Sequence, residues 1–404
     1  MKILLLPLFK MPSGHHHVAD AIINLIEKRT NKIECKKVDL LSYSSKTIEK
    51  AVSSLYLKWI HHTPRSYDWA YRHFAYTKNH KHVSFSGIER FFINKLYKLL
   101  TSEQPDLVIC THGFPSLLMS RLKLTGVVKI PVINIYTDFF MNDIWGRKGI
   151  DYHLVPNQEM KQQMIENYHI KERRIIVTGI PVHESFLKPG KTMHSHSYQK
   201  KILIAGGSSG LGNMIELVKN NERKPKYQYI ILCGNNKKLF NDIKKLNLDY
   251  VKPLPYISSK EEMNRLYDEV DAIVTKPGGV TISEVLRKGL PIFVHSALPG
   301  QEYINLQYLK SQYLVYEINR QNDLEAIISG VLQNELEMRK WKKAVSTYLD
   351  KFEIPSTNTM FQLISANTLK GAYFNKSGYP FLRVRNVVSK VMKYMKKTSP
   401  IDNI

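Results

Sequence analysis

The sequence predicts an α/β protein made of two doubly wound parallel sheets. Short apolar runs of strand length alternate along it with amphipathic runs of helix length, which is typical of parallel sheets covered by helices. The alternation stops at a polar stretch that contains Pro, Gly and Ser, residues 187–199, and then starts again. A chain of 404 residues with 43% hydrophobic content is long enough to bury two such cores.

Six apolar runs of strand length in the first half predict one sheet, with helical patterns between them. The predicted strands are residues 3–9, 33–40, 107–111, 132–137, 152–155 and 175–178. The second half repeats the pattern from residue 201 onwards. Its predicted strands are residues 201–205, 229–233, 250–251, 272–275, 291–294 and 314–316. Ligands of such sheets bind at the carboxyl ends of the strands, here in a cleft between the two domains.

These patterns divide the chain into four parts. We expect an N-terminal Rossmann-like domain over residues 1–186, with a helical insertion over 48–100 that is rich in aromatic and basic residues. A linker over 187–199 leads to a second Rossmann-like domain over 200–351. C-terminal helices and a basic tail follow over 352–404.

The net charge limits the expected classes of partner, and the cysteines indicate the redox compartment. The formal net charge of +24 predicts a polyanionic partner, either nucleic acid or an anionic membrane surface. Cys35, Cys110 and Cys233 are widely spaced, which favours a reducing compartment and argues against a disulfide framework or a thiolate zinc site. No run has the ~18 apolar residues of a spanning helix, so any membrane contact should be peripheral.

Two segments concentrate the positive charge. The insertion could be an ordinary helical unit with an aromatic core, or a basic amphipathic surface that lies on anionic lipid. The tail from residue 370 has eight basic residues against one aspartate, a net charge of +7. A solvated, frayed terminus is one interpretation of the tail. The other is a helix with an apolar stripe, formed by Val387, Val388, Val391, Met392 and Met395.

A histidine follows the first predicted strand, in the segment PSGHHHVADAI. Gly14 and His15 lie where a strand ends and a helix begins, a usual place for a catalytic group or a phosphate. His15 could act there as a general base toward an alcohol near neutral pH. A polar surface loop is the alternative. Adjacent helical residues diverge, so His16 and His17 cannot join His15 on one metal ion.

An aspartate stands at the end of a later strand of the same domain. Asp138 follows the predicted strand over 132–137, with Trp145 close behind. Its carboxylate could orient His15 or hold an acceptor hydroxyl. It could equally cap the next helix, which is the commoner use of an aspartate at such a place.

Glycine-rich turns follow two strands of the second half. The segment AGGSSGLG over residues 205–212 leads from a strand into a helix and could cradle a phosphate. It lacks the Lys-Ser/Thr ending of a P-loop. A second turn, Pro277-Gly278-Gly279, opens a helix that carries Glu284 near its second turn. A carboxylate there can accept hydrogen bonds from both hydroxyls of a ribose.

A further turn after the next strand completes this pattern. Pro299-Gly300 presents Gln301 and Glu302, an amide and a carboxylate that suit sugar hydroxyls. Together with the Gly-rich turns, these residues predict a site for a nucleotide diphosphate-sugar. The chain has no Asp-x-Asp pair. We therefore expect helix N-termini and backbone N–H groups to neutralise the pyrophosphate, with no cofactor and no obligatory metal.

These motifs resemble those of the processive diacylglycerol glucosyltransferases of Gram-positive bacteria and the plant monogalactosyldiacylglycerol synthases. More distantly, the sequence is similar to the lipid-linked N-acetylglucosaminyltransferase of peptidoglycan synthesis. The resemblance implies an inverting GT-B glycosyltransferase that uses a UDP-sugar. It covers residues 2–351, and its motifs are Gly14-His15, Thr137-Asp138-Phe139 with Ile144-Trp145, Thr178-Gly179-Ile180-Pro181, Gly206-Gly207-Ser208, Lys276-Pro277-Gly278-Gly279 with Glu284, and Pro299-Gly300-Gln301-Glu302.

The resemblance also implies roles for single residues. His15 would be the general base, with His16 as the alternative because Pro12 and Ser13 replace part of the usual G-x-G-H loop. The implied donor residues are Gly206, Gly207 and Ser208 at the pyrophosphate, Ile257 at the uracil, Glu284 at the ribose, and Gln301 with Glu302 at the hexose. The aromatic and basic insertion would correspond to the membrane and lipid-acceptor region.

We therefore expect a cytoplasmic, peripheral membrane enzyme that moves a hexose from a UDP-sugar to a lipid hydroxyl. Diacylglycerol or a glycosyl-diacylglycerol would be the acceptor, and the sequence leaves open whether the sugar is glucose, galactose or N-acetylglucosamine. The alternatives are a transferase with a non-lipid acceptor, a UDP-sugar epimerase of the same fold, and a non-catalytic UDP-sugar sensor. Nucleic acid is not expected as a partner, because the basic residues follow no helix-turn-helix, RRM or OB pattern.

Overall fold

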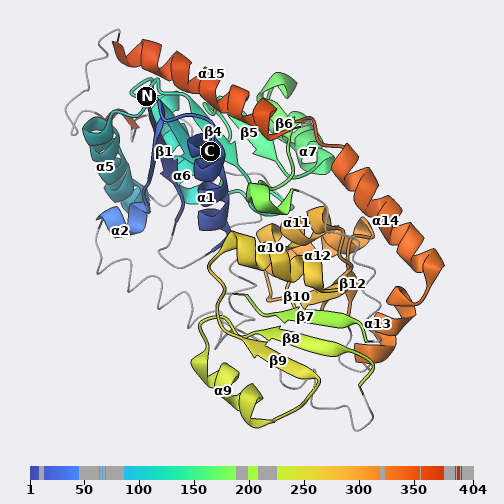
Figure 1. Cartoon of the computed structure of the whole chain (residues 1–404). Coiled ribbons are helices and arrows are strands. Elements are labelled where there is room, and N and C mark those ends of the chain that lie inside the picture. The colour runs from blue at the N-terminus through green and yellow to red at the C-terminus, as the bar shows by residue number, and fades with distance from the viewer. Residues whose placement is uncertain are drawn as a thin grey trace. The chain divides into compact units, whose positions relative to one another are not determined.

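The computed structural model describes most of the two predicted sheets and their helices (Figure 1). The described residues are 1–8, 13–44, 63, 66, 69, 86–187, 199–207, 225–318, 324–354, 356–376, 387, 389–391 and 393. Most of the insertion, most of the linker, Ser208 and most of the basic tail lie outside them. The chain divides into two compact units, Met1–Pro181 with Phe352–Ile404, and Val182–Lys351.

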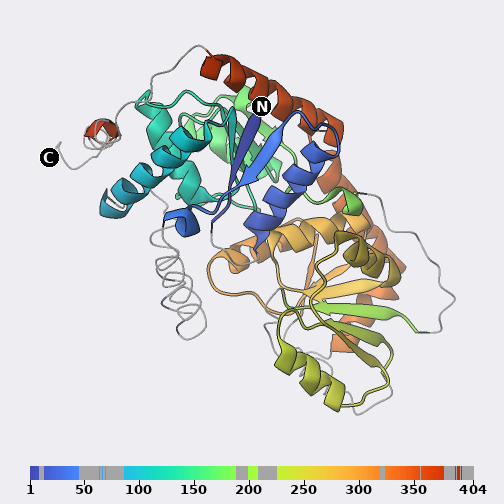
Figure 2. The ribbon, with the colours of Figure 1, turned by 60° about the vertical axis from the view of Figure 1, so that its left-hand side comes forward.

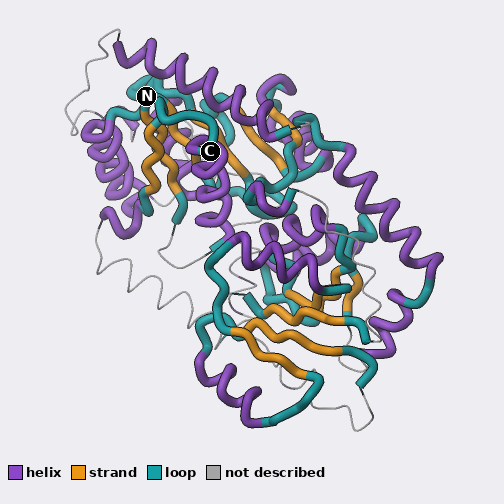
Figure 3. Tube along the Cα trace, viewed as in Figure 1, coloured by secondary structure: helices purple, strands orange, loops and turns teal. Residues whose placement is uncertain are grey.

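The first unit contains a six-stranded parallel sheet with the strand order β2-β1-β3-β4-β5-β6. Strands are orange in Figure 3. Its strands are β1 (Lys2–Leu6), β2 (Glu34–Lys37), β3 (Leu107–Cys110), β4 (Val132–Ile135), β5 (Tyr152–Val155) and β6 (Ile175–Val177). Its helices are α1 (Gly14–Glu27), α2 (Leu40–Ser44), α5 (Ser86–Glu103), α6 (Gly113–Leu124), α7 (Gln158–Tyr168) and α15 (Thr357–Lys376). All six strands predicted for this half are present.

The second unit contains another six-stranded parallel sheet, with the order β12-β11-β10-β7-β8-β9. Its strands are β7 (Lys201–Ala205), β8 (Gln228–Leu232), β9 (Val251–Leu254), β10 (Ala272–Thr275), β11 (Ile292–Val294) and β12 (Tyr316–Glu317). Its helices are α9 (Lys237–Lys245), α10 (Lys260–Glu269), α11 (Gly279–Lys288), α12 (Gln301–Ser311), α13 (Leu324–Leu332) and α14 (Glu335–Asp350). All six predicted strands are present here too, although β9 extends beyond its prediction and β12 begins later.

In each sheet the chain adds strands first on one side of its first strand and then on the other side. In the first unit the chain runs outward from β1 to β2 and returns to β3 on the other side of β1. In the second unit it runs outward from β7 to β9 and returns to β10 on the other side of β7. Such a switch point leaves a crevice at the carboxyl ends of the two central strands, where ligands of open α/β sheets bind.

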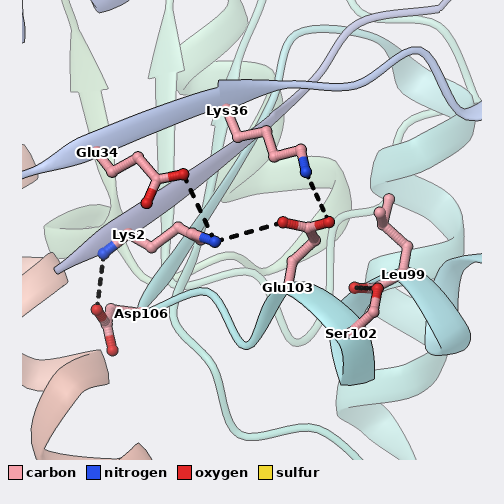
Figure 4. Close-up of polar contacts among 7 residues, drawn as sticks. All are labelled: Lys2, Glu34, Lys36, Leu99, Ser102, Glu103 and Asp106. Atoms are coloured by element: carbon pink, nitrogen blue, oxygen red, sulfur yellow. Dashed lines mark hydrogen bonds and ion pairs between the residues drawn. The ribbon is translucent and has the colours of Figure 1, made fainter.

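Opposite charges join the strands and helix α5 at the amino-terminal edge of the first sheet (Figure 4). The Lys2 ammonium lies 3.5 Å from Glu34 Oε1 and 3.4 Å from Glu103 Oε2, and Lys36 lies 2.8 Å from Glu103 Oε1. The backbone N–H of Lys2 donates to Asp106 Oδ2 at 2.8 Å. These contacts lie at the opposite edge of the sheet from the switch point.

The C-terminal segment returns to the first unit after α14. Arg29, just after α1, donates to the Asn358 and Thr357 side chains at the start of α15. Further on, Val387 and Val391 are fully buried in the core formed with residues of α5 and β3. Figure 2 shows this part of the tail as a short red helix. The interpretation of the tail as a solvated terminus is therefore wrong for these two valines, since their spacing gives one apolar helix face.

A glycine lets α15 pack directly on the backbone next to β3. A Cβ atom on Gly371 would lie 1.5 Å from the carbonyl oxygen of Asp106, a residue held to β1 by the bond to Lys2. We expect Gly371→Ala to lower the free energy of unfolding by about 1–3 kcal/mol or more, because the helix must move away. Thermal or urea unfolding measures the change.

Gly330 on α13 provides the matched control. A Cβ atom there would meet no atom within 4 Å in the part of the chain that the structure describes. Alanine is a better helix former than glycine, so Gly330→Ala should leave stability unchanged or raise it by up to ~1 kcal/mol. Equal stability of the two variants would contradict the close packing of α15.

Candidate active site

His15 is oriented by residues that follow two neighbouring strands of the first unit, β3 and β4. It lies in the first turn of α1, after β1, and its Nδ1 lies 2.9 Å from the carbonyl oxygen of Thr111, after β3. The same Nδ1 lies 2.9 Å from Oγ1 of Thr137, after β4. A carbonyl oxygen can only accept, so Nδ1 carries the proton of the neutral ring and Nε2 keeps its lone pair. His15 therefore presents a proton acceptor at the switch point.

Burial keeps the His15 imidazole neutral. It lowers the pKa of His15 to about 4, while the hydrogen bond to Thr111 opposes the shift and neighbouring His16 adds to it. At neutral pH the ring is thus in the form that can take a proton. Its pKa would rise if a negatively charged ligand came close, because an anion favours the imidazolium.

A second histidine contacts His15 and was not singled out in the sequence. His112 follows β3, and its ring meets that of His15 edge-on with centroids 4.5 Å apart. It caps α6, since its Nδ1 accepts from the Phe114 N–H at 3.0 Å. Burial and His15 hold the pKa of His112 well below its usual value, so the ring is neutral with its proton on Nε2. The sequence feature that could have identified His112 is its position directly after a predicted strand.

Asp138 lies one residue beyond the contact to His15. Asp138 follows β4 and is partly exposed. The side chain that contacts the His15 imidazole is the hydroxyl of the preceding residue, Thr137. The catalytic role of Asp138 stays a prediction. His16, the alternative base, is also partly exposed, and its backbone N–H donates to Ser13 O in the first turn of α1.

In the second unit, the predicted phosphate turns flank the switch point between β7 and β10. Gly206 and Gly207 follow β7, and Gly207 has φ +80°, which favours glycine. Pro277 and Gly278 follow β10, and Gly278 is the N-cap of α11 without a side-chain cap. Gly278 has φ −79°, and a Cβ there would meet no atom of the described residues within 4 Å.

Neither backbone strain nor packing against the described residues therefore requires glycine at position 278. A close approach of a ligand to the backbone would require it. The first N–H groups of α11, which begins at Gly279, lack partners within the helix and carry a partial positive charge. This turn can thus bind an anion such as a phosphate.

Glu284 is a buried carboxylate on α11, with only 6% of its surface exposed. The Tyr267 hydroxyl donates to Glu284 Oε2 at 3.2 Å, and the Lys260 ammonium lies 3.9 Å from Oε1. The ring of Phe186 packs against Tyr267 with centroids 5.6 Å apart. Burial raises the pKa of Glu284 to about 7, against the opposing effects of Lys260 and Tyr267.

The remaining predicted donor residues lie at the same edge of this sheet. Gly300, with φ +83°, is the N-cap of α12, which begins with Gln301. Glu302 Oε2 accepts from the Leu298 N–H at 2.7 Å and so holds the turn before the helix. Ile257 lies in the loop after β9 and is partly exposed. The structure thus brings all the described donor candidates to the carboxyl ends of β7, β9, β10 and β11.

The described residues show neither a cluster of metal ligands nor a membrane-spanning helix. Among the described residues, no three His, Cys, Asp or Glu side chains gather as ligands of a metal ion. None of the helices that the structure describes is long and apolar enough to cross a membrane. The expectation that no metal is needed stays a prediction.

Comparison with known proteins shows the family. A family model described as monogalactosyldiacylglycerol (MGDG) synthase matches residues 15–182, and the glycosyltransferase family 28 C-terminal domain matches residues 201–353. The uncharacterized glycosyltransferase YkoN of Bacillus subtilis (strain 168) is 40% identical over 349 residues, 86% of this chain and 92% of that protein. A processive diacylglycerol beta-glucosyltransferase of Bacillus cereus (strain G9842) is 32% identical over 275 residues, 65% of this chain and 69% of that protein.

The chain belongs to the family of processive diacylglycerol glucosyltransferases and monogalactosyldiacylglycerol synthases. Solved structures agree on the fold of this glycosyltransferase. MurG from Acinetobacter baumannii has a TM-score of 0.54 at 12% identity and covers 90% of this chain and 99% of its own. A UDP-GlcNAc 2-epimerase from Neisseria meningitidis bound to UDP-GlcNAc has a TM-score of 0.53 at 16% identity, covering 92% of this chain and 100% of its own. The predicted GT-B fold is confirmed.

Proposed function

We propose that this glycosyltransferase moves a hexose from a UDP-sugar to a lipid hydroxyl at a membrane surface. The observation that carries the donor assignment is the pairing of two features on α11. Its uncapped N-terminus at Gly278 suits a phosphate, and the buried Glu284 one and a half turns on suits a ribose. The UDP-GlcNAc-bound neighbour shares the fold and is consistent with such a donor.

The proposed reaction is a single displacement. His15 Nε2 takes the proton of the acceptor hydroxyl as that oxygen attacks the anomeric carbon from the face opposite UDP. The bond between the anomeric carbon and the β-phosphate oxygen breaks, so the configuration inverts and UDP leaves with the bonding electrons. The negative charge on the leaving UDP is stabilised by backbone N–H groups at the Gly207 and Gly278 turns. Gln301 and Glu302 bind the hexose hydroxyls.

The histidine pair suits a hydroxyl as the acceptor. His15 Nε2 offers a lone pair and His112 carries its proton on Nε2, while a hydroxyl both donates and accepts hydrogen bonds. The lipid part of the acceptor is supported by the name of the Bacillus cereus relative. The net charge of +24 favours an anionic lipid surface, and we propose a peripheral location at the inner face of the cell membrane.

A turnover panel tests this function. Purified protein is incubated with UDP-glucose, UDP-galactose or UDP-N-acetylglucosamine, and with mixed liposomes that contain diacylglycerol or a glycosyl-diacylglycerol. We expect a glycolipid whose new bond has the configuration opposite to that of the donor. An altered UDP-sugar without glycolipid would favour an epimerase, and tight donor binding with no turnover on any acceptor would favour a sensor.

Membrane association has its own test. Liposome flotation is compared with a nucleic-acid mobility shift at the same salt concentration. We expect flotation with anionic liposomes that weakens as salt screens the charges. Binding to RNA or DNA without binding to lipid would contradict the proposed location.

Removing the Tyr267 hydroxyl should change the pH dependence of donor binding. Protonated Glu284 cannot accept from both ribose hydroxyls, so UDP affinity should weaken as the pH falls through about 7. The Tyr267 hydroxyl favours the charged form, so Tyr267→Phe raises the pKa of Glu284 further and moves this loss to higher pH. Calorimetric titration with UDP across this pH range measures the midpoint. Tyr313→Phe, at a side chain that is 77% exposed, is the control and should leave the midpoint unchanged.

A further inference from the structure

His295 lies beside the proposed phosphate turn and has no assigned role. It follows β11 directly, and its backbone N–H donates to the Thr275 carbonyl at the end of β10 at 3.3 Å. The pairing of Val294 with Thr275 makes His295 the lateral neighbour of Lys276, the first residue after β10. His295 therefore lies beside the end of β10, the strand that leads into the turn at Gly278.

The imidazole of His295 has an unused polar atom. Its Nε2 is buried, and it has no hydrogen-bond partner among the residues that the structure describes. A buried nitrogen without a hydrogen-bond partner costs free energy, so we expect this nitrogen to have a function. The nearby Lys276 adds positive charge to this position, since it lowers the pKa of His295 further than burial alone, to about 4.

The charged groups on the elements around His295 are compatible with a bound anion. Lys276 follows β10. Glu317 on β12, which pairs with Val294, forms an ion pair with Lys310. Glu302 at the start of α12 accepts from the Leu298 N–H. A ligand with negative charge would thus meet Lys276, the N-terminus of α11 and the imidazole from one edge of the sheet.

We propose that His295 binds the diphosphate of the nucleotide donor through its Nε2 nitrogen. This inference rests on the proposed UDP-sugar donor and adds a residue to its phosphate site. The Nε2–H donates to a phosphate oxygen, and the negative charge draws a second proton onto the ring. His295 therefore contributes proton uptake to UDP binding at neutral pH, opposite in sign to the proton that Glu284 releases when it binds the ribose. His295 thereby also stabilises the UDP that leaves in the transfer reaction.

Calorimetric titrations with UDP and with uridine distinguish the binding of the diphosphate from the binding of the nucleoside. Replacing His295 by leucine should weaken UDP binding by roughly tenfold to a hundredfold, the usual effect of losing a hydrogen bond to a charged group. Uridine affinity should be unchanged, which also shows that the variant is folded. His295→Gln keeps an N–H near the Nε2 position, so it should recover part of the UDP affinity.

Proton uptake is measured by repeating the UDP titration in two buffers that differ in ionisation enthalpy. Relative to wild-type protein, His295→Leu and His295→Gln should take up fewer protons or release more, because the proton that Glu284 loses on UDP binding is common to all three. Lys244→Gln is the control, because Lys244 is exposed in the last turn of α9, toward the amino-terminal edge of the sheet. It should behave as wild type.

Three outcomes overturn the inference. Wild-type UDP affinity in His295→Leu would show that the imidazole does not contact the diphosphate. An equal loss of UDP and uridine affinity would show that His295 only supports the fold of the site. A wild-type protein that binds no UDP would overturn the proposed donor together with the inference, a result distinct from the other two.

Discussion

Replacing His15 by alanine is expected to lower kcat for glycosyl transfer by about 10²–10⁴-fold, the usual contribution of a general base. The structure gives the reason: Nδ1 is held by Thr111 and Thr137, which leaves the Nε2 lone pair for the acceptor hydroxyl. The donor candidates lie in the other unit, so UDP affinity should be retained. Turnover with liposome-embedded acceptor and calorimetry with UDP measure the two quantities separately.

Two neighbouring histidines provide controls for this prediction. His16→Ala tests the alternative base, and His17→Ala tests the effect of losing any imidazole from the same turn of α1. Both should retain most of the activity. A larger loss in His16→Ala than in His15→Ala would transfer the role of the base to His16.

The pH profile gives an independent check on His15. Burial lowers its pKa to about 4, so the neutral, proton-accepting form persists as the pH falls through 7. Protonation of His15 in the free enzyme should then reduce kcat/KM only near its own lower pKa. A decline near pH 7 is expected instead from Glu284 through donor binding. A decline near pH 7 that survives in a Glu284 variant would contradict this assignment.

Replacing Glu284 by alanine is expected to weaken UDP binding by about a hundredfold or more. Each hydrogen bond to a charged group contributes ~1.5–3 kcal/mol, and the proposed carboxylate accepts one from each ribose hydroxyl. The site around Glu284 is built in advance, since Tyr267 and Lys260 already favour the charged form. Calorimetric titration with UDP measures the loss.

A deoxygenated nucleotide makes this prediction specific for the ribose. Wild-type protein should bind UDP far more tightly than 2′,3′-dideoxy-UDP, whereas Glu284→Ala should bind the two alike. Glu269→Gln, an exposed carboxylate at the end of α10, is the control and should keep the wild-type preference. A preference for UDP that survives in Glu284→Ala would remove the ribose role from this residue.

The fold and most donor candidates could be predicted because their signals are local. Apolar runs mark the strands, and Gly-rich turns after β7 and β10 mark the strand ends where parallel sheets bind ligands. The helix of the C-terminal tail was harder to predict. Whether Val387 and Val391 are buried depends on a hydrophobic surface that α5 and β3 supply from a distant part of the chain.

The sequence by itself determined the two-sheet architecture and the candidate residues that follow its strands, because periodicity and turn chemistry act over a few neighbouring positions. Only the tertiary structure decided the tautomers and pKa values of those residues. The tautomer of His15 depends on Thr111 and Thr137, which reach it from separate strands. The raised pKa of Glu284 depends on its burial in the folded core, with Tyr267 on another helix as the hydrogen-bond donor. Such environments form only when segments distant in the chain pack together, so local patterns do not contain them.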